Sequence, residues 1–240
     1  MKRMELGKRF RWEVAASCAA LITLLVLPGP QVPPAGASEG DQPAVMRVEE
    51  DWRLSLNEPG DDVDAPQFYT AMSPHHHLDS AYAQVLWNYR ELPEFEAGGL
   101  QVQGWLDEED VDLREAGHGN LSQDAESVTW TQRLETDGNL VKFRIVQGHS
   151  STWGSFGGDS TEVNIAAPVA NLNHYSPLTS KANSGVSYGS NRVSLLIITE
   201  VRYYGADGNL IWLDRQPVIV FTLQAASSAP IDAAWQANAN

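Results

Sequence analysis

Hydrophobic and polar residues alternate with a period of two in nearly every segment of this chain beyond Pro66. Successive side chains of a β-strand point to opposite faces, so this pattern predicts strands with one buried and one wet face. No segment carries the sustained 3.6-residue stripe of a helix packed on a core. Nine segments rich in β-branched and aromatic residues fit the strand pattern: 67–73, 80–92, 99–106, 127–136, 140–148, 160–167, 192–205, 209–214 and 218–223.

The number and brevity of these segments predict a fold made of sheets alone. Gly, Pro, Asn and Asp separate the segments, as they do in all-β sandwiches and barrels. Trp130 and Phe143 fall on the predicted buried faces of their strands, whereas Arg133 and Arg144 fall on the wet faces. We therefore expect an antiparallel β-sandwich of jelly-roll (concanavalin-like) type.

Two of the predicted turns share the sequence Asp-Gly-Asn-Leu, at 137–140 and 207–210. Asp-Gly tolerates the positive φ angles at the crown of a hairpin, so each copy predicts a β-hairpin. An EF-hand calcium loop needs further oxygen ligands and a distal Glu, which neither copy has.

The first 37 residues have the layout of an export signal. Five basic residues are followed by the apolar run 15–27, which is shorter than the roughly 20 residues that a helix needs to cross a bilayer. Ala35-Gly36-Ala37 supplies the small residues of a cleavage site. We predict a signal peptide over 1–37 and a secreted or periplasmic protein; an uncleaved signal segment is the alternative, and would be the chain's one membrane contact.

The rest of the chain divides by composition into three parts. Residues 38–66 form an acidic, proline-bearing arm with one predicted strand at 51–56, which is a candidate to join a sheet. Residues 67–225 hold the nine predicted strands and are expected to form the β-sandwich domain. The tail 226–240 is small and polar, and is expected to be flexible.

The chain carries a net charge of −15, and loss of the predicted signal peptide makes it more negative. This charge argues against nucleic acid as a partner, because phosphate binding needs basic patches. The single cysteine, Cys18, lies in the predicted signal peptide. The mature chain is therefore expected to have no disulfide, no thiolate chemistry and no Cys-ligated zinc.

Three histidines in a row, at 75–77, raise the question of a metal site. Imidazole is the commonest metal ligand, and Asp79 follows closely. Adjacent residues of an extended chain point in opposite directions, so only His75 and His77 would face one ion. We favour a polar loop here and predict no metal.

The acidic segment 107–115 carries Asp110, Asp112 and Glu115. Paired carboxylates at strand spacing serve retaining glycosidases, but those enzymes use Glu at both positions. We interpret the segment as a solvated acidic loop and expect no cofactor, with calcium bound by some of these carboxylates as the alternative.

The strand 140–148 runs into a loop with a polar set of side chains. Gln147 and His149 share one face, an arrangement that β-jelly-roll polysaccharide lyases use to bind a uronate and abstract its proton. Trp153 follows in the loop. Tyr175 lies near the start of the long polar segment 173–193. We expect this segment to hold no strand until Arg192. These four residues are candidate ligand-binding residues, and none is predicted to be catalytic.

Trp105 is predicted to lie beside Gln101 and Gln103 on the polar face of the strand 99–106. Sugar rings stack on exposed indoles while amides hold their hydroxyl groups, so this face is a candidate glycan-binding surface. The prediction requires that neither a second layer nor the N-terminal arm covers the face.

The loop phrases WGSFGG, LNHYSP and NSGVSYGSNRV resemble those of a family of secreted bacterial β-sandwich proteins without assigned activity. The resemblance implies a single extracellular domain and transfers no catalytic residue. The leading hypothesis is a secreted, non-catalytic module that binds polysaccharide or a cell-surface glycan on the Trp and Gln face. The alternatives are a polysaccharide-active enzyme on the same fold, with Gln147, His149 and Tyr175 in lyase-like roles, and a structural extracellular protein without a small ligand.

Overall fold

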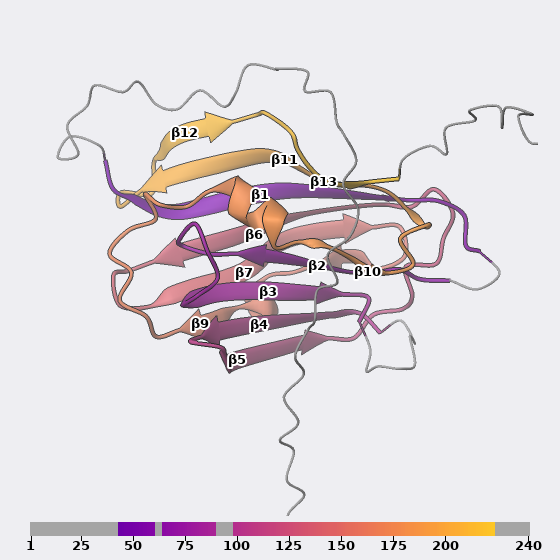
Figure 1. Ribbon diagram of the computed structural model, residues 1–240, viewed down its shortest axis with the longest axis horizontal. Coiled ribbons are helices and arrows are strands. Elements are labelled where there is room, and N and C mark those ends of the chain that lie inside the picture. The colour runs from indigo at the N-terminus through magenta and orange to yellow at the C-terminus, as the bar shows by residue number, and fades with distance from the viewer. Residues whose placement is uncertain (1–42, 61–63, 90–97, 224–240) are drawn as a thin grey trace, which may run out of the picture. The chain divides into compact units, whose positions relative to one another are not determined.

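The structure is a computed structural model that describes residues 43–60, 64–89 and 98–223 (Figure 1). These residues form two antiparallel β-sheets and very little helix, so the all-β prediction is confirmed. The predicted signal peptide, the first residues of the arm and the predicted C-terminal tail lie outside the described residues.

The larger sheet has eight strands. Its main path runs β12-β11-β1-β6-β7-β8, with β13 also paired to β11 and β9 also paired to β7. The strands are β1 (Val45–Leu56), β6 (Ser127–Thr136), β7 (Val141–Ser150), β8 (Gly154–Phe156), β9 (Val163–Ile165), β11 (Val193–Gly205), β12 (Leu210–Asp214) and β13 (Val218–Thr222).

The smaller sheet has five strands in the order β10-β2-β3-β4-β5. Its strands are β2 (Gln67–Met72), β3 (Ala81–Trp87), β4 (Leu100–Leu106), β5 (Glu109–Ala116) and β10 (Gly185–Tyr188). Strands β2 to β5 follow one another along the chain and across the sheet, which makes them a meander. In Figure 1 this sheet lies in front of the larger one.

Strand β1 is longer than its predicted counterpart. The sequence predicts a strand at 51–56 as a candidate to join a sheet, whereas β1 begins at Val45 and pairs with β11 on one side and β6 on the other. Its inward side chains, among them Val48, Trp52 and Leu54, are buried. The segment is therefore central to the larger sheet, because its inner face is apolar and its two edges are both hydrogen-bonded.

The two sheets enclose a core rich in indole rings. Trp52 and Trp130 stack across β1 and β6 with ring centroids 5.7 Å apart, and Trp87 of the smaller sheet lies 4.3 Å from Trp130. Phe143 is also fully buried, as predicted. Burial of a large apolar side chain stabilises a fold by about 1.5–3 kcal/mol, so this cluster accounts for much of the contact between the sheets.

A buried polar group also joins the sheets. Gln132 of β6 accepts a hydrogen bond through its Oε1 from the Thr70 hydroxyl of β2, at 2.5 Å, and another from Trp130 Nε1 at 3.1 Å. Trp87 Nε1 in turn donates to Thr70 Oγ1 at 3.0 Å. These bonds tie Thr70 of β2 to β6 and satisfy three buried polar groups, whereas Gln132 Nε2 has no partner among the described residues.

Both Asp-Gly-Asn-Leu sites are hairpin turns, as predicted. The β6–β7 turn has Gly138 at φ 99° and the β11–β12 turn has Gly208 at φ 77°, a backbone region that favours glycine. Asp137 and Asp207 each accept hydrogen bonds from backbone amides within their own turn. Both carboxylates thus accept hydrogen bonds from the backbone of their own turns.

Two segments interpreted as loops contain regular structure. The acidic segment 107–115 turns at Asp107 and Glu108, both at positive φ, and then forms most of strand β5. The segment 173–193 holds helix α1 (Pro177–Ala182) and strand β10. Ser176 caps α1 through its side chain and proline follows at the first helical position, but six residues are too few to show a helical stripe.

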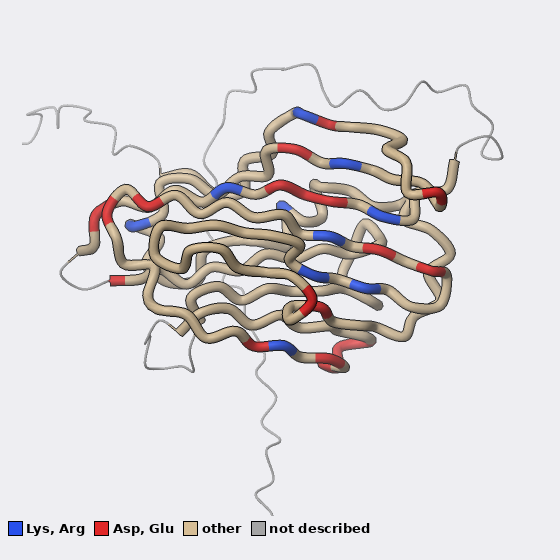
Figure 2. Tube along the Cα trace, turned by 180° about the vertical axis from the view of Figure 1, so that it is seen from behind, with Lys and Arg blue, Asp and Glu red and all other residues tan. Residues whose placement is uncertain are grey.

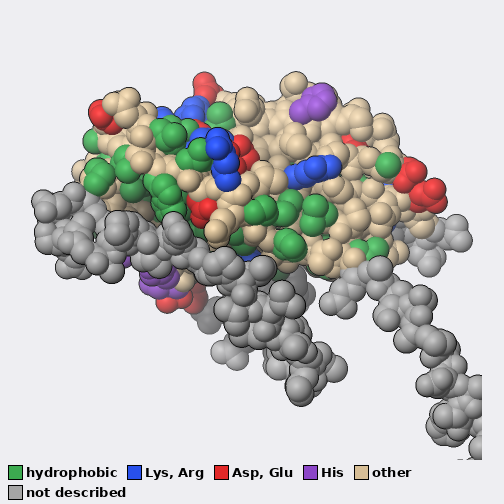
Figure 3. All heavy atoms as spheres, turned by 90° about the horizontal axis from the view of Figure 1, so that it is seen from above, with side chains coloured by type: hydrophobic (Ala, Val, Ile, Leu, Met, Phe, Trp, Pro, Cys, Tyr) green, Lys and Arg blue, Asp and Glu red, His purple; other side chains and the backbone are tan. Residues whose placement is uncertain are grey.

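One edge of the larger sheet exposes apolar side chains. Figure 3, the view from above, shows hydrophobic side chains gathered near β12 and β13 among basic ones. The exposed members are Leu210, Ile211, Trp212, Ile219 and, on α1, Leu178.

Among the described residues, no helix has the length and apolar character needed to cross a membrane.

Candidate functional site

The outer face of the smaller sheet carries a row of aromatic and amide side chains. Trp105 lies opposite Tyr82 on β3, with nearly parallel rings, 2° apart, and centroids separated by 5.9 Å. Gln103 lies opposite Gln84, and both are half-buried. The sequence-predicted set Gln101, Gln103 and Trp105 is therefore brought together on one face, and we call this face the aromatic–amide face.

A chain of hydrogen bonds orients these side chains along β4. Trp105 Nε1 donates to Gln103 Oε1 at 3.1 Å, and Gln103 Nε2 donates to Gln101 Oε1 at 2.6 Å. Gln101 Nε2 then donates to Glu115 of β5 at 2.7 Å. Each amide still has a second N–H and a second oxygen lone pair, so the face keeps donors and acceptors for a ligand while its geometry is held.

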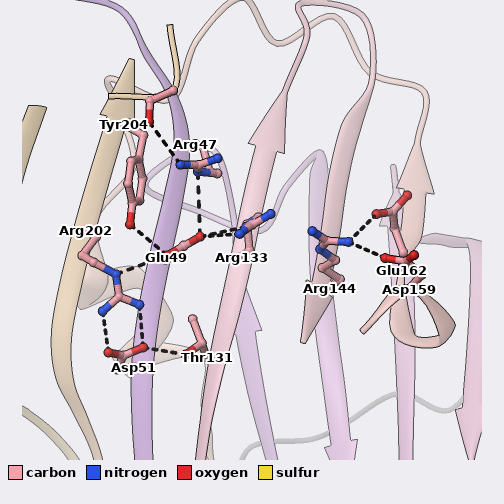
Figure 4. A network of polar contacts seen from close by, with 11 residues as sticks. Arg47, Glu49, Asp51, Thr131, Arg133, Arg144, Asp159, Glu162, Arg202 and Tyr204 are labelled. Atoms are coloured by element: carbon pink, nitrogen blue, oxygen red, sulfur yellow. Dashed lines mark hydrogen bonds and ion pairs between the residues drawn. The ribbon is translucent and has the colours of Figure 1, made fainter. Parts of the chain in front are cut away.

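The larger sheet instead carries charged residues on several neighbouring strands (Figure 2). Figure 4 shows Glu49 of β1 at the centre of an ion-pair network. Arg133 approaches Glu49 Oε1 at 2.7 Å, and Arg202 and Tyr204 donate to Glu49 Oε2 at 3.2 and 3.0 Å. Burial raises the pKa of Glu49, but Arg133 and these hydrogen bonds outweigh it and hold the pKa below its ordinary value.

Asp51, two residues further along β1, belongs to the same network. Arg202 binds both of its carboxylate oxygens, at 2.5 and 2.7 Å, and the Thr131 hydroxyl donates to it at 2.7 Å. A bidentate guanidinium pair of this kind has the geometry of a strong charge-assisted contact. The charge of Asp51 is thus offset within the protein.

A groove of about 740 Å³ lies beside the network on this face. Its lining includes Arg53 of β1, Thr129 of β6, and Gln147 and His149 of β7. Arg53 pairs in register with Thr129, and Thr129 with His149, so these three outward side chains form one row across three strands. The sequence-predicted pair Gln147 and His149 is therefore brought together here, but on the sheet opposite Trp105.

The other two predicted residues pack elsewhere. Trp153 is half-buried; its ring stacks on His118 at 4.6 Å, and its Nε1 donates to the Gly119 carbonyl at 2.6 Å. Tyr175 is buried and donates its hydroxyl to the carboxylate of Glu50. Neither side chain lines the groove, so the structure does not bring Tyr175 to Gln147 and His149 as a lyase-like arrangement requires.

Glu50 is a fully buried carboxyl group that the sequence analysis missed. It accepts hydrogen bonds from Trp52 Nε1, at 2.9 Å, and from Tyr175. Burial raises the pKa of Glu50 to about 7, although both hydrogen bonds act in the opposite direction. Burial also raises the pKa of Tyr175 well above its ordinary value, and the neighbouring Glu50 carboxylate adds to this shift.

The predicted metal candidates do not assemble. His75 and His77 have ring centroids 5.8 Å apart, and His77 Nδ1 contacts Asp79 at 3.5 Å on the surface. Asp112 pairs with Arg114 at 2.5 Å. Within residues 43–60, 64–89 and 98–223, no group of three or more His, Cys, Asp or Glu side chains is placed to hold a metal ion.

Three residues of the two faces were missed from the sequence. Tyr82 and Gln84 alternate with the buried Ala81, Ala83 and Val85, so the strand pattern already assigned them to the outer face. Arg53 was missed because the strand was placed in an arm. Its outward position follows from the buried neighbours Trp52 and Leu54.

The fold and these faces define an all-β protein with two antiparallel sheets and a polar outer face on each. A scan against protein-family models, a search of curated proteins and a search of solved structures each found no match to this chain. The function of the chain is therefore inferred from the geometry of its described residues.

Proposed function

We propose that this protein is an exported, non-catalytic β-sandwich module that binds a neutral polysaccharide or cell-surface glycan on the aromatic–amide face. The observation that carries the proposal is the outward pair of Trp105 and Tyr82 beside the hydrogen-bonded row of Gln103 and Gln101. Indole and phenol rings offer apolar faces to the C–H groups of a sugar, and amides bond its hydroxyls.

The electrostatics of the face favour a neutral ligand. The Gln, Tyr and Trp side chains named above carry no charge. Asp110 pairs with Trp105 and Glu115 pairs with Gln101 on the neighbouring strand β5, and these two carboxylates disfavour an anionic ligand. Residues 101 to 105 extend over about 13 Å of strand, which suits a short stretch of sugar chain. The half-buried state of these side chains limits the entropy lost when a ligand orders them.

Export and the finer fold type belong to the same proposal. The basic and apolar layout of residues 1–37 supports a cleaved signal peptide and hence a secreted or periplasmic location. The jelly-roll connectivity expected from the sequence stays a prediction. No metal, cofactor or nucleic acid takes part in the proposed binding.

Calorimetric titration with neutral oligosaccharides, chosen from hits on a glycan array, tests the proposal. Trp105→Ala should weaken binding by about 10-fold or more, because it removes the stacking surface. Gln103→Ala should weaken it as well with less effect on packing. Trp212→Ala is the matched control, since Trp212 is 40% exposed on the other sheet. Absence of any neutral ligand, or equal affinity of the Trp105 and Trp212 variants and the wild type, overturns the proposal.

Gln147 and His149 line the same groove, which supports the enzymatic alternative. Tyr175 is buried beside Glu50 and does not line that groove, so its position does not support an enzyme. If neither face binds a saccharide, the structural alternative takes precedence.

A further inference from the structure

We propose that the groove over β1, β6 and β7 is a second binding site, for the carboxylate of an acidic sugar residue (a uronate), with Arg53 as its ion-pair partner. This site lies on the opposite sheet from the aromatic–amide face and rests on different residues.

Arg53 stands apart from the other arginines in the part of the chain that the structure describes. Arg133 and Arg202 bind Glu49 and Asp51, and Arg144 binds Asp159 at 2.6 Å. Each of the remaining described arginines likewise has a polar partner: Arg47, Arg114, Arg192 and Arg215. The side chain of Arg53 is exposed in the groove, and its guanidinium has no hydrogen bond or ion pair with any described residue.

No described carboxylate is paired with Arg53, although the chain has 31 Asp and Glu against 16 Lys and Arg. The carboxylate nearest to it in the lining, Asp51, already binds Arg202 through both oxygens. The planar fork of Arg53 is therefore available for a carboxylate brought by a ligand, in the bidentate geometry that guanidinium favours.

The neighbouring groups suit the rest of a sugar ring. Thr129, His149 and Gln147 line the groove, and none of their side chains has a hydrogen bond with a described residue. Arg53 and His149 lie two strands apart, a separation of about 10 Å. A hydroxylated ring between them would place its carboxylate at Arg53 and its hydroxyls at the imidazole, the amide and the Thr129 hydroxyl.

The charge balance favours a monoanion over phosphate. A phosphate monoester carries a charge of roughly −1.5 to −2 near neutral pH and is held by clusters of cations. Arg53 is the one lysine or arginine in the lining, and Asp51 lies close by. A uronate carboxylate brings a single charge and needs a single cation.

Calorimetric titration of the purified protein with tetramers of galacturonate, glucuronate and mannuronate tests this inference. We expect binding of at least one acidic tetramer in the range of about 0.1–1 mM, since one exposed ion pair and a few hydrogen bonds carry it. The methyl ester of the same tetramer, which keeps the hydroxyls and loses the charge, should bind about 10-fold more weakly.

Variants assign the binding to the groove. Arg53→Gln should lower the affinity by about 10-fold, and His149→Ala should lower it by a smaller factor. Lys181→Gln removes one positive charge from the exposed surface of α1 and should leave the affinity unchanged.

Three outcomes overturn the inference: no heat with any acidic tetramer at about 10 mM, equal binding of acid and ester, or equal affinity of the Arg53→Gln and Lys181→Gln variants. Thermal unfolding of each variant checks that the exposed substitutions leave the fold intact. Failure of the neutral-glycan proposal does not affect these outcomes, because its variants lie on the other sheet.

Discussion

Glu49 and Glu50 are consecutive residues of β1, and their carboxylates lie on opposite faces of the larger sheet. Glu49 meets Arg133 and Arg202 on the outer face, whereas Glu50 lies in the core against Trp52 and Tyr175. Their pKa values move in opposite directions: below the ordinary value for Glu49, and up to about 7 for Glu50. Strand alternation thus gives two identical side chains opposite electrostatic roles.

The first prediction concerns Glu50→Gln. The pKa of Glu50 is raised from 4.5 to about 7 in the folded protein, so the unfolded chain loses this proton first as pH rises. The contribution of the protonated carboxyl is fully present below pH 4.5 and is lost as pH rises towards 7, by about 3 kcal/mol. The amide variant should escape this loss and be the more stable protein at pH 8.

Urea unfolding between pH 4 and 8 measures this difference. Glu58→Gln, at an exposed glutamate, is the matched control for removal of a carboxylate. A difference between Glu50→Gln and the wild type that stays constant across the pH range contradicts the assignment of a buried, protonated carboxyl.

The second prediction concerns Glu49→Gln. Loss of this carboxylate leaves Arg133 and Arg202 close together without their shared counter-ion, and should reduce the free energy of unfolding by about 1–3 kcal/mol at pH 7. Because the pKa of Glu49 is lowered, its contribution is present above its ordinary value of 4.5 and is lost as pH falls. Chemical unfolding should therefore show that the difference in free energy of unfolding between the wild type and Glu49→Gln is smaller at pH 3 than at pH 7. A difference of the same size at both pH values argues against the network.

The third prediction concerns the polar contact between the sheets. Thr70→Val removes the hydroxyl that donates to Gln132 and accepts from Trp87, and leaves both groups buried without that partner. The free energy of unfolding should fall by about 1–3 kcal/mol in urea titrations. Thr129→Val, at an exposed threonine without a described hydrogen bond, should change it by less than about 0.5 kcal/mol. If Thr70→Val and Thr129→Val change the free energy of unfolding equally, the buried hydrogen bond of Thr70 does not stabilise the contact between the sheets.

The fourth prediction concerns export. Intact-mass measurement and N-terminal sequencing of protein collected from the periplasm or medium should give a chain that begins at Ser38, directly after Ala37. A chain that keeps residues 1–37 and fractionates with membranes would instead support the uncleaved segment.

Much of the fold was predictable because alternation is a local property. Trp130 and Phe143 face inward as the pattern indicates, and Gly138 and Gly208 occupy the hairpin turns that Asp-Gly favours. The short helix α1 was not predictable from periodicity, because its six residues do not complete two turns.

The candidate site was predictable only in part. Gln101 and Gln103 share a face with Trp105 because residues two apart on a strand always do. The groove needed the pairing of Arg53 with Thr129 and of Thr129 with His149, between residues far apart in the chain. Tyr175 looked like a loop residue from its neighbours, and its place beside Glu50 depends on a contact across 125 positions.

The sequence by itself determined which side chains of each strand lie on the same face, since the steric geometry of an extended backbone sends neighbours to opposite sides. The tertiary structure decided which of those faces is covered and which strands lie side by side. Tertiary contacts placed β1 in the centre of a sheet, Glu50 inside the core and Arg53 in a groove. These placements depend on pairing between distant segments and on how much apolar surface the whole chain removes from water.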